Sequence, residues 1–313
     1  MASLQPLSTI EAMNQVDENV DHTNEEINIS GGQGQTKIKG YVAIKRHFLE
    51  SKFRRELKVL KDLNKNGGNK HVVQLLKANI RREIHMPHSG TDLFFVLTEY
   101  GKPFDNFILR NVFGQILDGL LFMKEVHKYS HFDLKLENIL LKRNGTVVLC
   151  DFSAAKTHKE IMTKLDGKDI PGVLLKEGTS MYMCPELLLD IGIPFGEKAD
   201  IWSLGVLFFQ CAFKYTIFTQ IDLYGKKNKT YLYQNFVRTD YTMSRIETNT
   251  DESWNQIFKR ASDKPLTKNM KEMLRSMLSF ISFYRYGLRA VAQCDYMSKP
   301  RRTNRAIAKE LFL

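Results

Sequence analysis

The chain has 313 residues, of which 43% are hydrophobic and 26% charged, as in an ordinary soluble globular protein. No apolar run approaches the roughly 20 residues of a membrane-spanning helix, and residues 1–10 lack the basic and apolar regions of a secretory signal. The four cysteines are scattered without metal-like spacing, so we expect free thiols in a reducing compartment, the cytoplasm or the nucleus.

The formal net charge of +11 is unevenly distributed. Residues 1–36 carry six carboxylates and no Lys or Arg, which leaves +17 for the remainder of the chain. A basic body suits polyphosphate, acidic partners or nucleic acid. Because no aromatic residues interleave with the basic ones, a solvated lysine-rich surface is favoured and no specific nucleic-acid binding is expected. Residues 1–26 are polar and lack periodicity, which predicts a disordered acidic leader.

The first part of the chain predicts a small sheet that carries one helix. Residues 41–45 form a β-prone run, and apolar residues at helical spacing predict a helix over residues 48–63. Residues 72–76 and 93–98 are further predicted strands.

From residue 111 onward the pattern becomes mainly helical. One apolar face predicts a core helix around residues 112–121, and residues 147–150 predict a short buried strand. Residues 199–213 are apolar nearly all round, and residues 265–280 are amphipathic, so both stretches predict helices. Two lobes of unequal character follow, and a cleft between lobes is a normal place for a ligand.

The decisive segment is residues 131–138, with the sequence HFDLKLEN. It resembles the catalytic loop H-R-D-L-x-x-x-N of protein kinases. Four fixed residues at about 5% frequency each arise by chance in a chain this long about twice in a thousand. The alternative, polar loop residues without a joint role, is therefore disfavoured.

Other motifs follow in the order of the same family. Residues 151–153, DFS, resemble D-F-G; residues 178–186 resemble the end of an activation segment that closes on A-P-E; residues 200–205 resemble the start of the central helix. Arg285 matches the arginine that normally pairs with the A-P-E glutamate, here Glu186. Upstream, residues 42–45 reproduce V-A-I-K.

The resemblance covers about residues 31–293 and implies the α+β, bilobal protein-kinase fold, with a small β-sheet lobe and a larger helical lobe. The implied organisation is a leader over residues 1–26, a reduced N-lobe over 27–100, a C-lobe over 101–298, and a basic, helical tail over 299–313.

By this resemblance, ATP and Mg²⁺ are the expected cofactors. Lys45 would bind the α- and β-phosphates and would be held by Glu56, while Asn138 and Asp151 would hold Mg²⁺. Each residue alone has an ordinary interpretation, such as an exposed strand lysine or a solvated glutamate on a helix.

The resemblance also implies catalytic roles. Asp133 would accept or orient the proton of the attacking hydroxyl. Lys135 resembles the serine/threonine branch of the family, in which this lysine neutralises the transferring phosphoryl group, and Thr179 would support the same geometry.

Further nucleotide contacts are expected at three places. Residues 98–101 resemble the hinge between lobes, so Thr98, Glu99 and Tyr100 would border the adenine, although an ordinary strand end is the alternative. Cys150 precedes Asp151 and would border the pocket, or be an inert core thiol. Gly32 and Gly34 offer a G-x-G, which is also typical of any flexible linker.

Several positions depart from the family pattern. Lys37 occupies the third glycine position of the phosphate-binding loop, and the segments between Gly32, Lys45 and Glu56 are short. Phe132 replaces the arginine that normally binds a phosphorylated activation loop, which predicts activity independent of that phosphorylation. Ser153 replaces the glycine of D-F-G.

The sequence thus predicts an ATP- and Mg²⁺-dependent protein kinase, monomeric and not bound to membranes, acting on Ser or Thr hydroxyls of protein substrates. The alternative is a pseudokinase, a binding or allosteric module with little or no transfer. A small-molecule phosphotransferase is less favoured, because it would lack the segment over residues 179–186.

Overall fold

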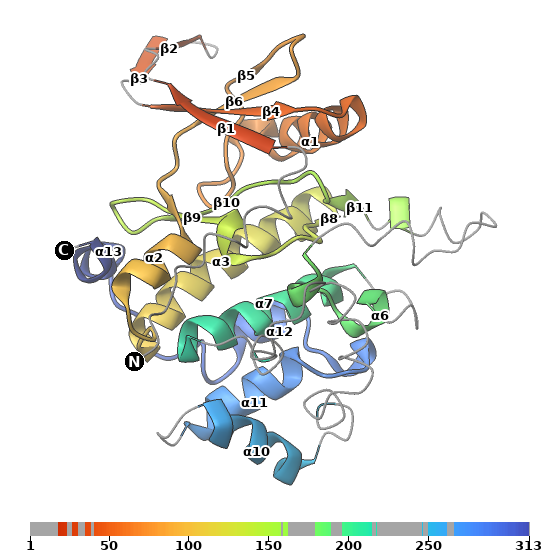
Figure 1. Ribbon diagram of the computed structural model, residues 1–313, viewed down its shortest axis with the longest axis vertical. Coiled ribbons are helices and arrows are strands. Elements are labelled where there is room, and N and C mark those ends of the chain that lie inside the picture. Colours follow the sequence, from red (N-terminus) through yellow and green to blue (C-terminus); the bar gives the residue numbers. More distant parts are fainter. Residues whose placement is uncertain are drawn as a thin grey trace, which may run out of the picture. The chain divides into compact units, whose positions relative to one another are not determined.

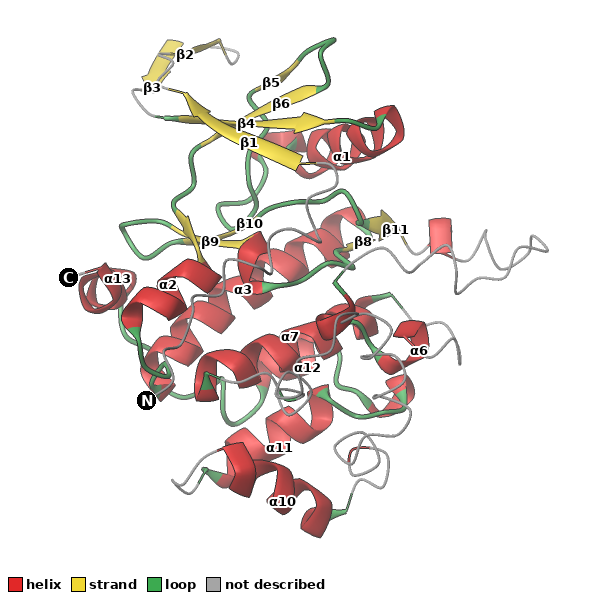
Figure 2. Ribbon diagram, in the orientation of Figure 1, coloured by secondary structure: helices red, strands yellow, loops and turns green. Residues whose placement is uncertain are grey.

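The computed structural model describes residues 18–23, 27–30, 35–38, 41–157, 159–161, 179–188, 196–214, 217, 246, 250–261 and 266–312. The chain divides into two compact units. The first comprises residues up to Gly68 and Val73–His88, and the second comprises Asn69–Val72 and the chain from Ser89 onward. Most strands belong to the first unit and most helices to the second (Figures 1 and 2). This confirms the predicted α+β composition.

A four-stranded antiparallel sheet forms the first unit, in the order β1-β4-β6-β5. Its strands are β1 (Glu18–Thr23), β4 (Val42–His47), β6 (Glu83–Pro87) and β5 (Lys77–Ala78). A separate hairpin pairs β2 (Ile27–Ser30) with β3 (Gln35–Ile38). The strand predicted at residues 41–45 is therefore confirmed as β4.

Strand β1 lies within the stretch that was predicted to be a disordered leader. It pairs with β4 in continuous register from Glu18↔His47 to Thr23↔Val42. For residues 18–23 the prediction of disorder is wrong, because backbone hydrogen bonds to β4 replace the apolar side chains that the composition lacks. Residues 1–17 and 24–26 lie outside the described residues.

Helix α1 (Glu50–Leu63) confirms the helix predicted in the first unit. It buries Phe53, Val59, Leu60 and Leu63 on one face. The strand predicted at residues 72–76 is wrong. Only Val72 forms an isolated bridge there, and the Asn64 side chain instead accepts from the Leu75 N–H and donates to the Val73 carbonyl.

The second unit is built around two long helices, α3 (Asn106–His127) and α7 (Glu197–Phe213). Phe113 of α3 and Phe208 of α7 pack edge to face, with ring centroids 4.9 Å apart. The shorter helices are α2 (Leu93–Tyr100), α6 (Pro185–Leu188), α10 (Asp251–Ala261), α11 (Lys268–Met277), α12 (Leu288–Gln293) and α13 (Asn304–Phe312). Helices α3, α7 and α11 confirm the three predicted in this part of the chain.

Short strands and 3₁₀ turns carry the loops of the second unit. One sheet has the order β10-β9-β7, and β11 pairs with β8. The strands are β7 (Thr91–Asp92), β8 (Tyr129–Ser130), β9 (Ile139–Leu141), β10 (Val147–Leu149) and β11 (Lys156–Thr157). The 3₁₀ turns are η3 (Leu136–Asn138), η4 (Ser180–Tyr182) and η6 (Ser282–Tyr284), with η2 (Lys65–Gly67) in the first unit. The strand predicted at residues 147–150 is confirmed as β10.

The strand predicted at residues 93–98 is wrong, because these residues form helix α2. The Asp92 side chain caps the helix by accepting from the Phe95 N–H at 2.8 Å. Gly101 ends it in the left-handed conformation, with φ 73°. The two units consequently divide after His88, earlier than the lobe boundary expected after residue 100.

The C-terminal segment is part of the second unit. Helix α13 confirms the helix predicted within residues 299–313. Tyr100 donates to Glu310 at 2.8 Å, and the Asn111 side chain of α3 donates to the Arg302 carbonyl at 2.8 Å. The tail is therefore bound to α2 and α3 rather than extending from the domain.

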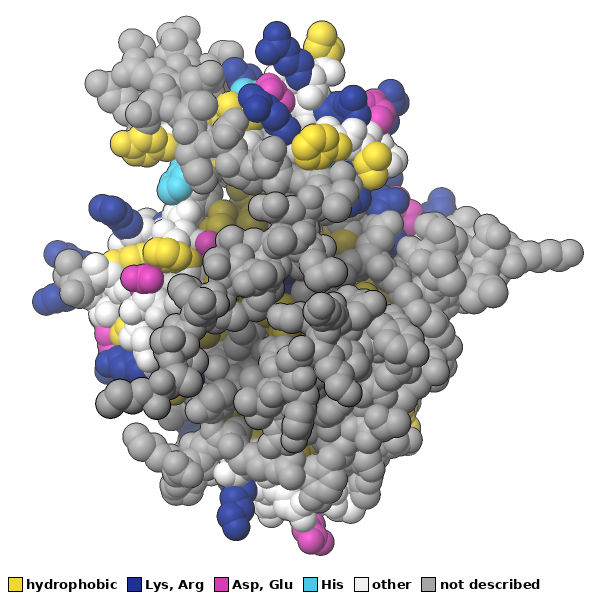
Figure 3. Space-filling model, in the orientation of Figure 1, with side chains coloured by type: hydrophobic (Ala, Val, Ile, Leu, Met, Phe, Trp, Pro, Cys, Tyr) yellow, Lys and Arg dark blue, Asp and Glu magenta, His cyan; other side chains and the backbone are white. Residues whose placement is uncertain are grey.

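The surface of the first unit mixes charges of both signs. On the face drawn in Figure 3, Lys and Arg side chains lie beside Asp and Glu side chains over α1, β5 and β6. None of the helices in the described ranges is long and apolar enough to cross a membrane.

Candidate active site

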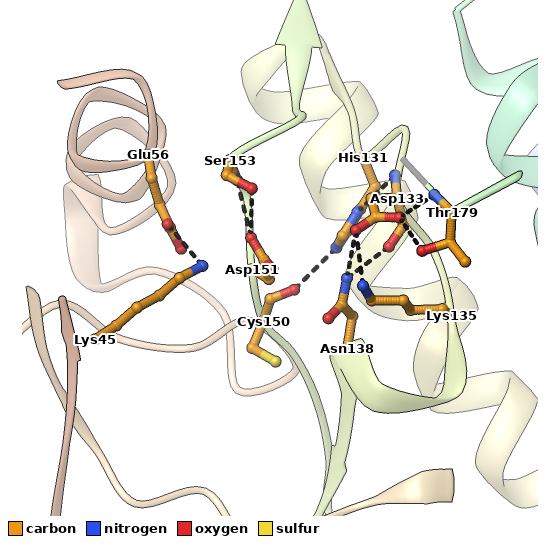
Figure 4. A network of polar contacts seen from close by, with 10 residues as sticks. All are labelled: Lys45, Glu56, His131, Asp133, Lys135, Asn138, Cys150, Asp151, Ser153 and Thr179. Atoms are coloured by element: carbon orange, nitrogen blue, oxygen red, sulfur yellow. Dashed lines mark hydrogen bonds and ion pairs between the residues drawn. The ribbon is translucent and has the colours of Figure 1, made fainter. Parts of the chain in front are cut away.

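A buried ion pair joins strand β4 to helix α1. Lys45 Nζ lies 2.9 Å from Glu56 Oε2, and their side chains are 5% and 0% exposed (Figure 4). The contact predicted between these two residues is present. Such burial requires that both charges be paired, because an isolated charge in the interior is costly.

His47 is a third member of this cluster and belongs to none of the family motifs. Its Nε2 lies 2.9 Å from the same Glu56 oxygen, and its side chain is 1% exposed. The signal was available, since residues two apart on a strand share a face, and His47 follows Lys45 by two positions.

In the second unit, one carboxylate fixes the backbone of the candidate catalytic loop. Asp200 of α7 accepts hydrogen bonds from the backbone N–H groups of His131 at 2.8 Å and Phe132 at 2.9 Å. Phe132 adopts φ 64°, a left-handed conformation that a bulky residue seldom takes without such support. Burial raises the pKa of the Asp200 carboxyl, while His131 and the two N–H groups act in the opposite direction.

Sequence reasoning assigned residues 200–205 to a helix but gave Asp200 no role. A carboxylate in a helix that is apolar nearly all round has to find buried partners, and this pattern was the available signal.

Asp133 is held from two sides within this unit (Figure 4). The Asn138 side-chain amide donates to the Asp133 carbonyl at 2.7 Å and to its Oδ2 at 3.1 Å. Thr179 donates to Oδ1 through its backbone N–H at 2.9 Å and its hydroxyl at 3.2 Å. The structure thus brings together Asp133, Asn138 and Thr179, as the motifs predicted.

Lys135 completes this cluster. Its Nζ lies 3.4 Å from Asp133 Oδ2. Burial disfavours the lysine charge, but the carboxylates of Asp133, Asp151 and Glu137 outweigh that effect and raise the pKa of Lys135 above its usual value. A cation is therefore fixed beside the candidate base.

Asp151 follows strand β10 and also has a left-handed backbone, with φ 59°. The N–H of Cys150, the residue before Asp151, donates to the Asn138 carbonyl at 3.0 Å. This hydrogen bond holds the backbone next to Asp151 close to Asn138. His131 Nε2 lies 3.1 Å from the Cys150 carbonyl oxygen, and this contact also fixes the segment. Ser153, in the glycine position of the motif, donates to Asp151 Oδ1 through its N–H at 3.2 Å and its hydroxyl at 2.7 Å.

Asn138 and Asp151 offer an amide oxygen and a carboxylate, which are the kinds of ligand that a magnesium ion takes. The side-chain nitrogen of Asn138 donates both of its hydrogen bonds to Asp133, so the side-chain oxygen faces away from Asp133. Among the described residues, no group of three or more His, Cys, Asp or Glu side chains could hold a metal ion. Mg²⁺ typically takes one or two protein oxygens and completes its shell with phosphate and water.

The residues predicted to border adenine lie on helix α2 and not at a strand end. Thr98 and Glu99 are exposed there, the Thr98 hydroxyl donates to the Phe94 carbonyl, and Tyr100 binds Glu310. The last passage of the chain from the first unit to the second is at His88–Ser89, ahead of these residues, and their role beside adenine stays a prediction. Gly32 and Gly34 lie outside the described residues.

The predicted partner of Arg285 is confirmed. Its guanidinium lies 2.7 Å from Glu186 Oε1, and the arginine side chain is fully buried. The same group donates to the carbonyls of Ser279 at 2.7 Å and Phe280 at 3.0 Å. This links α6 to the loop that precedes α12.

Phe132 has a basic neighbour on β11. Lys156 Nζ lies 5.7 Å from the centroid of the Phe132 ring, and Lys156 is 4% exposed. A buried cation on the aromatic face thus lies beside the position where the motif has arginine.

Comparison with known proteins agrees with this geometry. A family model described as the protein kinase domain matches residues 36–297. Serine/threonine-protein kinase SKS1 of Saccharomyces cerevisiae is 27% identical over 250 residues, covering 74% of this chain and 47% of that protein. The serine/threonine-protein kinase STE7 homolog of Candida albicans is 33% identical over 111 residues, which cover 36% of this chain and 17% of that homolog.

A plant relative is also similar. Serine/threonine-protein kinase Nek6 of Oryza sativa subsp. japonica is 37% identical over 117 residues, which are 37% of this chain and 20% of that protein. The chain thus spans less than half the length of each of these three relatives.

Proposed function

Because this chain belongs to the protein kinase family, we propose that it transfers the γ-phosphate of ATP to serine or threonine hydroxyls of proteins. The observation that carries the proposal is the set of groups around Asp133, which Asn138 and Thr179 orient and beside which Lys135 holds a positive charge. Phosphoryl transfer asks a protein chiefly for positioning and for stabilisation of charge.

In this proposal Asp133 accepts the proton of the attacking hydroxyl. Its two carboxylate oxygens already bind Thr179 and Asn138, so the carboxylate cannot rotate away from the substrate. Lys135 stabilises the charge on the transferring phosphoryl oxygens. Lys135 and Thr179 support the serine/threonine preference, as does the similarity to three proteins that are named serine/threonine-protein kinases.

Nucleotide binding is assigned to the remaining residues. Lys45, held by Glu56, would bind the α- and β-phosphates, and Asn138 and Asp151 would hold a magnesium ion, whose contribution would be to neutralise phosphate charge. Cys150 is proposed to border the nucleotide.

Two observations favour the alternative, a pseudokinase. Ser153 makes two hydrogen bonds to Asp151 Oδ1, and this oxygen must then share its lone pairs with a metal ion. The replaced third glycine, Lys37, points in the same direction.

The test is transfer of radiolabelled phosphate from ATP to generic protein substrates with Mg²⁺. Transfer by the native protein that falls at least a hundredfold in Asp133→Asn, but not in the exposed control Asp118→Asn, supports the enzyme. Nucleotide binding without transfer supports the pseudokinase. If Ser153→Gly then gains transfer, the two serine hydrogen bonds are the cause.

A further inference from the structure

His47 is buried against the Lys45–Glu56 ion pair. Residues 45 and 47 of β4 point to the face of the sheet that α1 covers, since side chains alternate along a strand. Both Lys45 Nζ and His47 Nε2 lie 2.9 Å from Glu56 Oε2. The His47 ring also lies against Phe53 of α1, with ring centroids 6.0 Å apart.

The chemistry of Glu56 explains why a second partner matters. A carboxylate with no exposed surface needs donors for its lone pairs, and losing a partner leaves a buried charge uncompensated. In the proposed function Lys45 has to share its donors with phosphate oxygens. A histidine on the same Glu56 oxygen keeps that carboxylate occupied while Lys45 does so.

We propose that His47 is a positioning residue that holds the Glu56 carboxylate beside Lys45 and fixes α1 against β4. The inference rests on the proposed function only in assigning phosphate binding to Lys45.

Both ring nitrogens of His47 are buried, and neither makes a hydrogen bond of good geometry among the described residues. The 2.9 Å approach of Nε2 to Glu56 Oε2 is therefore a close polar contact inside the cluster. Glutamine, which can place an uncharged amide group at the same distance from Glu56, is the conservative replacement.

The neighbouring strand supplies a matched control. His85 of β6 is 4% exposed and pairs with Ile44 of β4, so it lies on the opposite face of the sheet from Lys45. Its Nε2 lies 3.6 Å from Glu83. Replacing His85 tests the general cost of removing a buried histidine from this sheet.

The first experiment measures the dissociation constant of MgATP by calorimetry. We expect His47→Leu to weaken binding about tenfold, because an apolar side chain offers no polar group to the buried Glu56 carboxylate. His47→Gln is expected to stay within about twofold of the native protein, and His85→Leu to bind normally even if its thermal stability falls. Native affinity in His47→Leu, or an equal loss in His85→Leu, would overturn the proposal.

The second experiment needs no nucleotide and separates this inference from the proposed function. Amide hydrogen exchange across α1 is compared in the native protein, His47→Leu, His47→Gln and His85→Leu. We expect about tenfold faster exchange at residues 53–60 in His47→Leu alone. If the native protein binds no MgATP, the proposed function fails, and the exchange rates alone decide the role of His47. Unchanged exchange in His47→Leu would contradict it.

Discussion

Each unit contains one cluster of charged candidate residues, and the two clusters are held in different ways. In the first unit, the side chains of Lys45 and His47 both contact the Glu56 carboxylate. In the second unit, Asp133 and Asp200 both accept hydrogen bonds from backbone N–H groups. A side-chain pair fixes the ends of two side chains, whereas a carboxylate bound to backbone N–H groups fixes the path of the chain itself.

This difference predicts different consequences for isosteric substitutions. Replacing Asp200 in the second unit is expected mainly to lower stability, since it releases a loop that includes Phe132 in a left-handed conformation. Changes at Lys45, His47 or Glu56 in the first unit are expected mainly to weaken nucleotide binding, because they displace the proposed phosphate ligand Lys45 and leave the backbone pairing of β4 in place.

The largest loss of stability is expected for Asp200→Asn. The two backbone N–H donors would then face a side chain with only one accepting oxygen. The free energy of unfolding should fall by about 4 kcal/mol, in the range for breaking a buried charged interaction. Glu56→Gln should cost about half as much. Urea unfolding monitored by circular dichroism measures both. Equal losses would remove the distinction between the two units.

Arg285→Met should cost about 3 kcal/mol of unfolding free energy, because it leaves the buried Glu186 carboxylate without its cation. Since Arg285 also binds backbone carbonyls, this site combines both kinds of anchoring. The double variant Arg285→Met, Glu186→Met should recover part of the loss, which a double-mutant cycle measures. No recovery would show that the carbonyl contacts dominate.

Thr179→Val separates the two donors to Asp133, since it removes the hydroxyl and keeps the backbone N–H. We expect phosphate transfer to fall about tenfold, as for one hydrogen bond, with stability nearly unchanged. Thr179→Ser should retain activity. The measurement is kcat under saturating ATP, and a hundredfold loss would mean that the hydroxyl rather than the backbone orients Asp133.

The smallest effect is expected at Glu83 in the first unit. Hydrogen bonds from Asn79 at 2.6 Å and Arg46 at 2.8 Å lower the pKa of Glu83 to about 2. The ionised form is thus favoured by folding, so its contribution is complete above the usual pKa of 4.5 and is lost as pH falls towards 2.

Glu83→Gln should therefore lower unfolding free energy by about 1 kcal/mol at pH 7, a small value because the Arg46 side chain is 52% exposed. The difference between native protein and variant should shrink steadily below pH 4.5. A difference that grows on acidification would contradict the assigned sign.

The sequence predicted those contacts that depend on a few residues in a fixed local order. The Asp133–Asn138 bond lies within one loop, and the Arg285–Glu186 pair was recognised from the family pattern. The contact of Asp200 with the same loop was missed, because it joins segments far apart in the sequence and belongs to no short motif.

Secondary structure was mispredicted where an apolar run was too short to show its period. The apolar run at residues 93–98 is too short to distinguish a strand from a helix. The signals that indicate a helix are Asp92, which caps its N-terminus, and Gly101, which ends it. Strand β1 could not be predicted from composition, since its order comes from pairing with β4.

The contacts of the C-terminal segment have a practical consequence for anyone who shortens this protein. The family match ends at residue 297, yet Asn304 donates to Gln115 Oε1 at 3.3 Å, and Gln115 in turn accepts from the Val147 N–H at 3.0 Å. A side chain at Gly145 would clash with the Asn304 backbone, so the two segments are closely fitted. Removing the residues after 297 would therefore take away contacts that hold the β9–β10 hairpin, which lies between Asn138 and Asp151 in the chain.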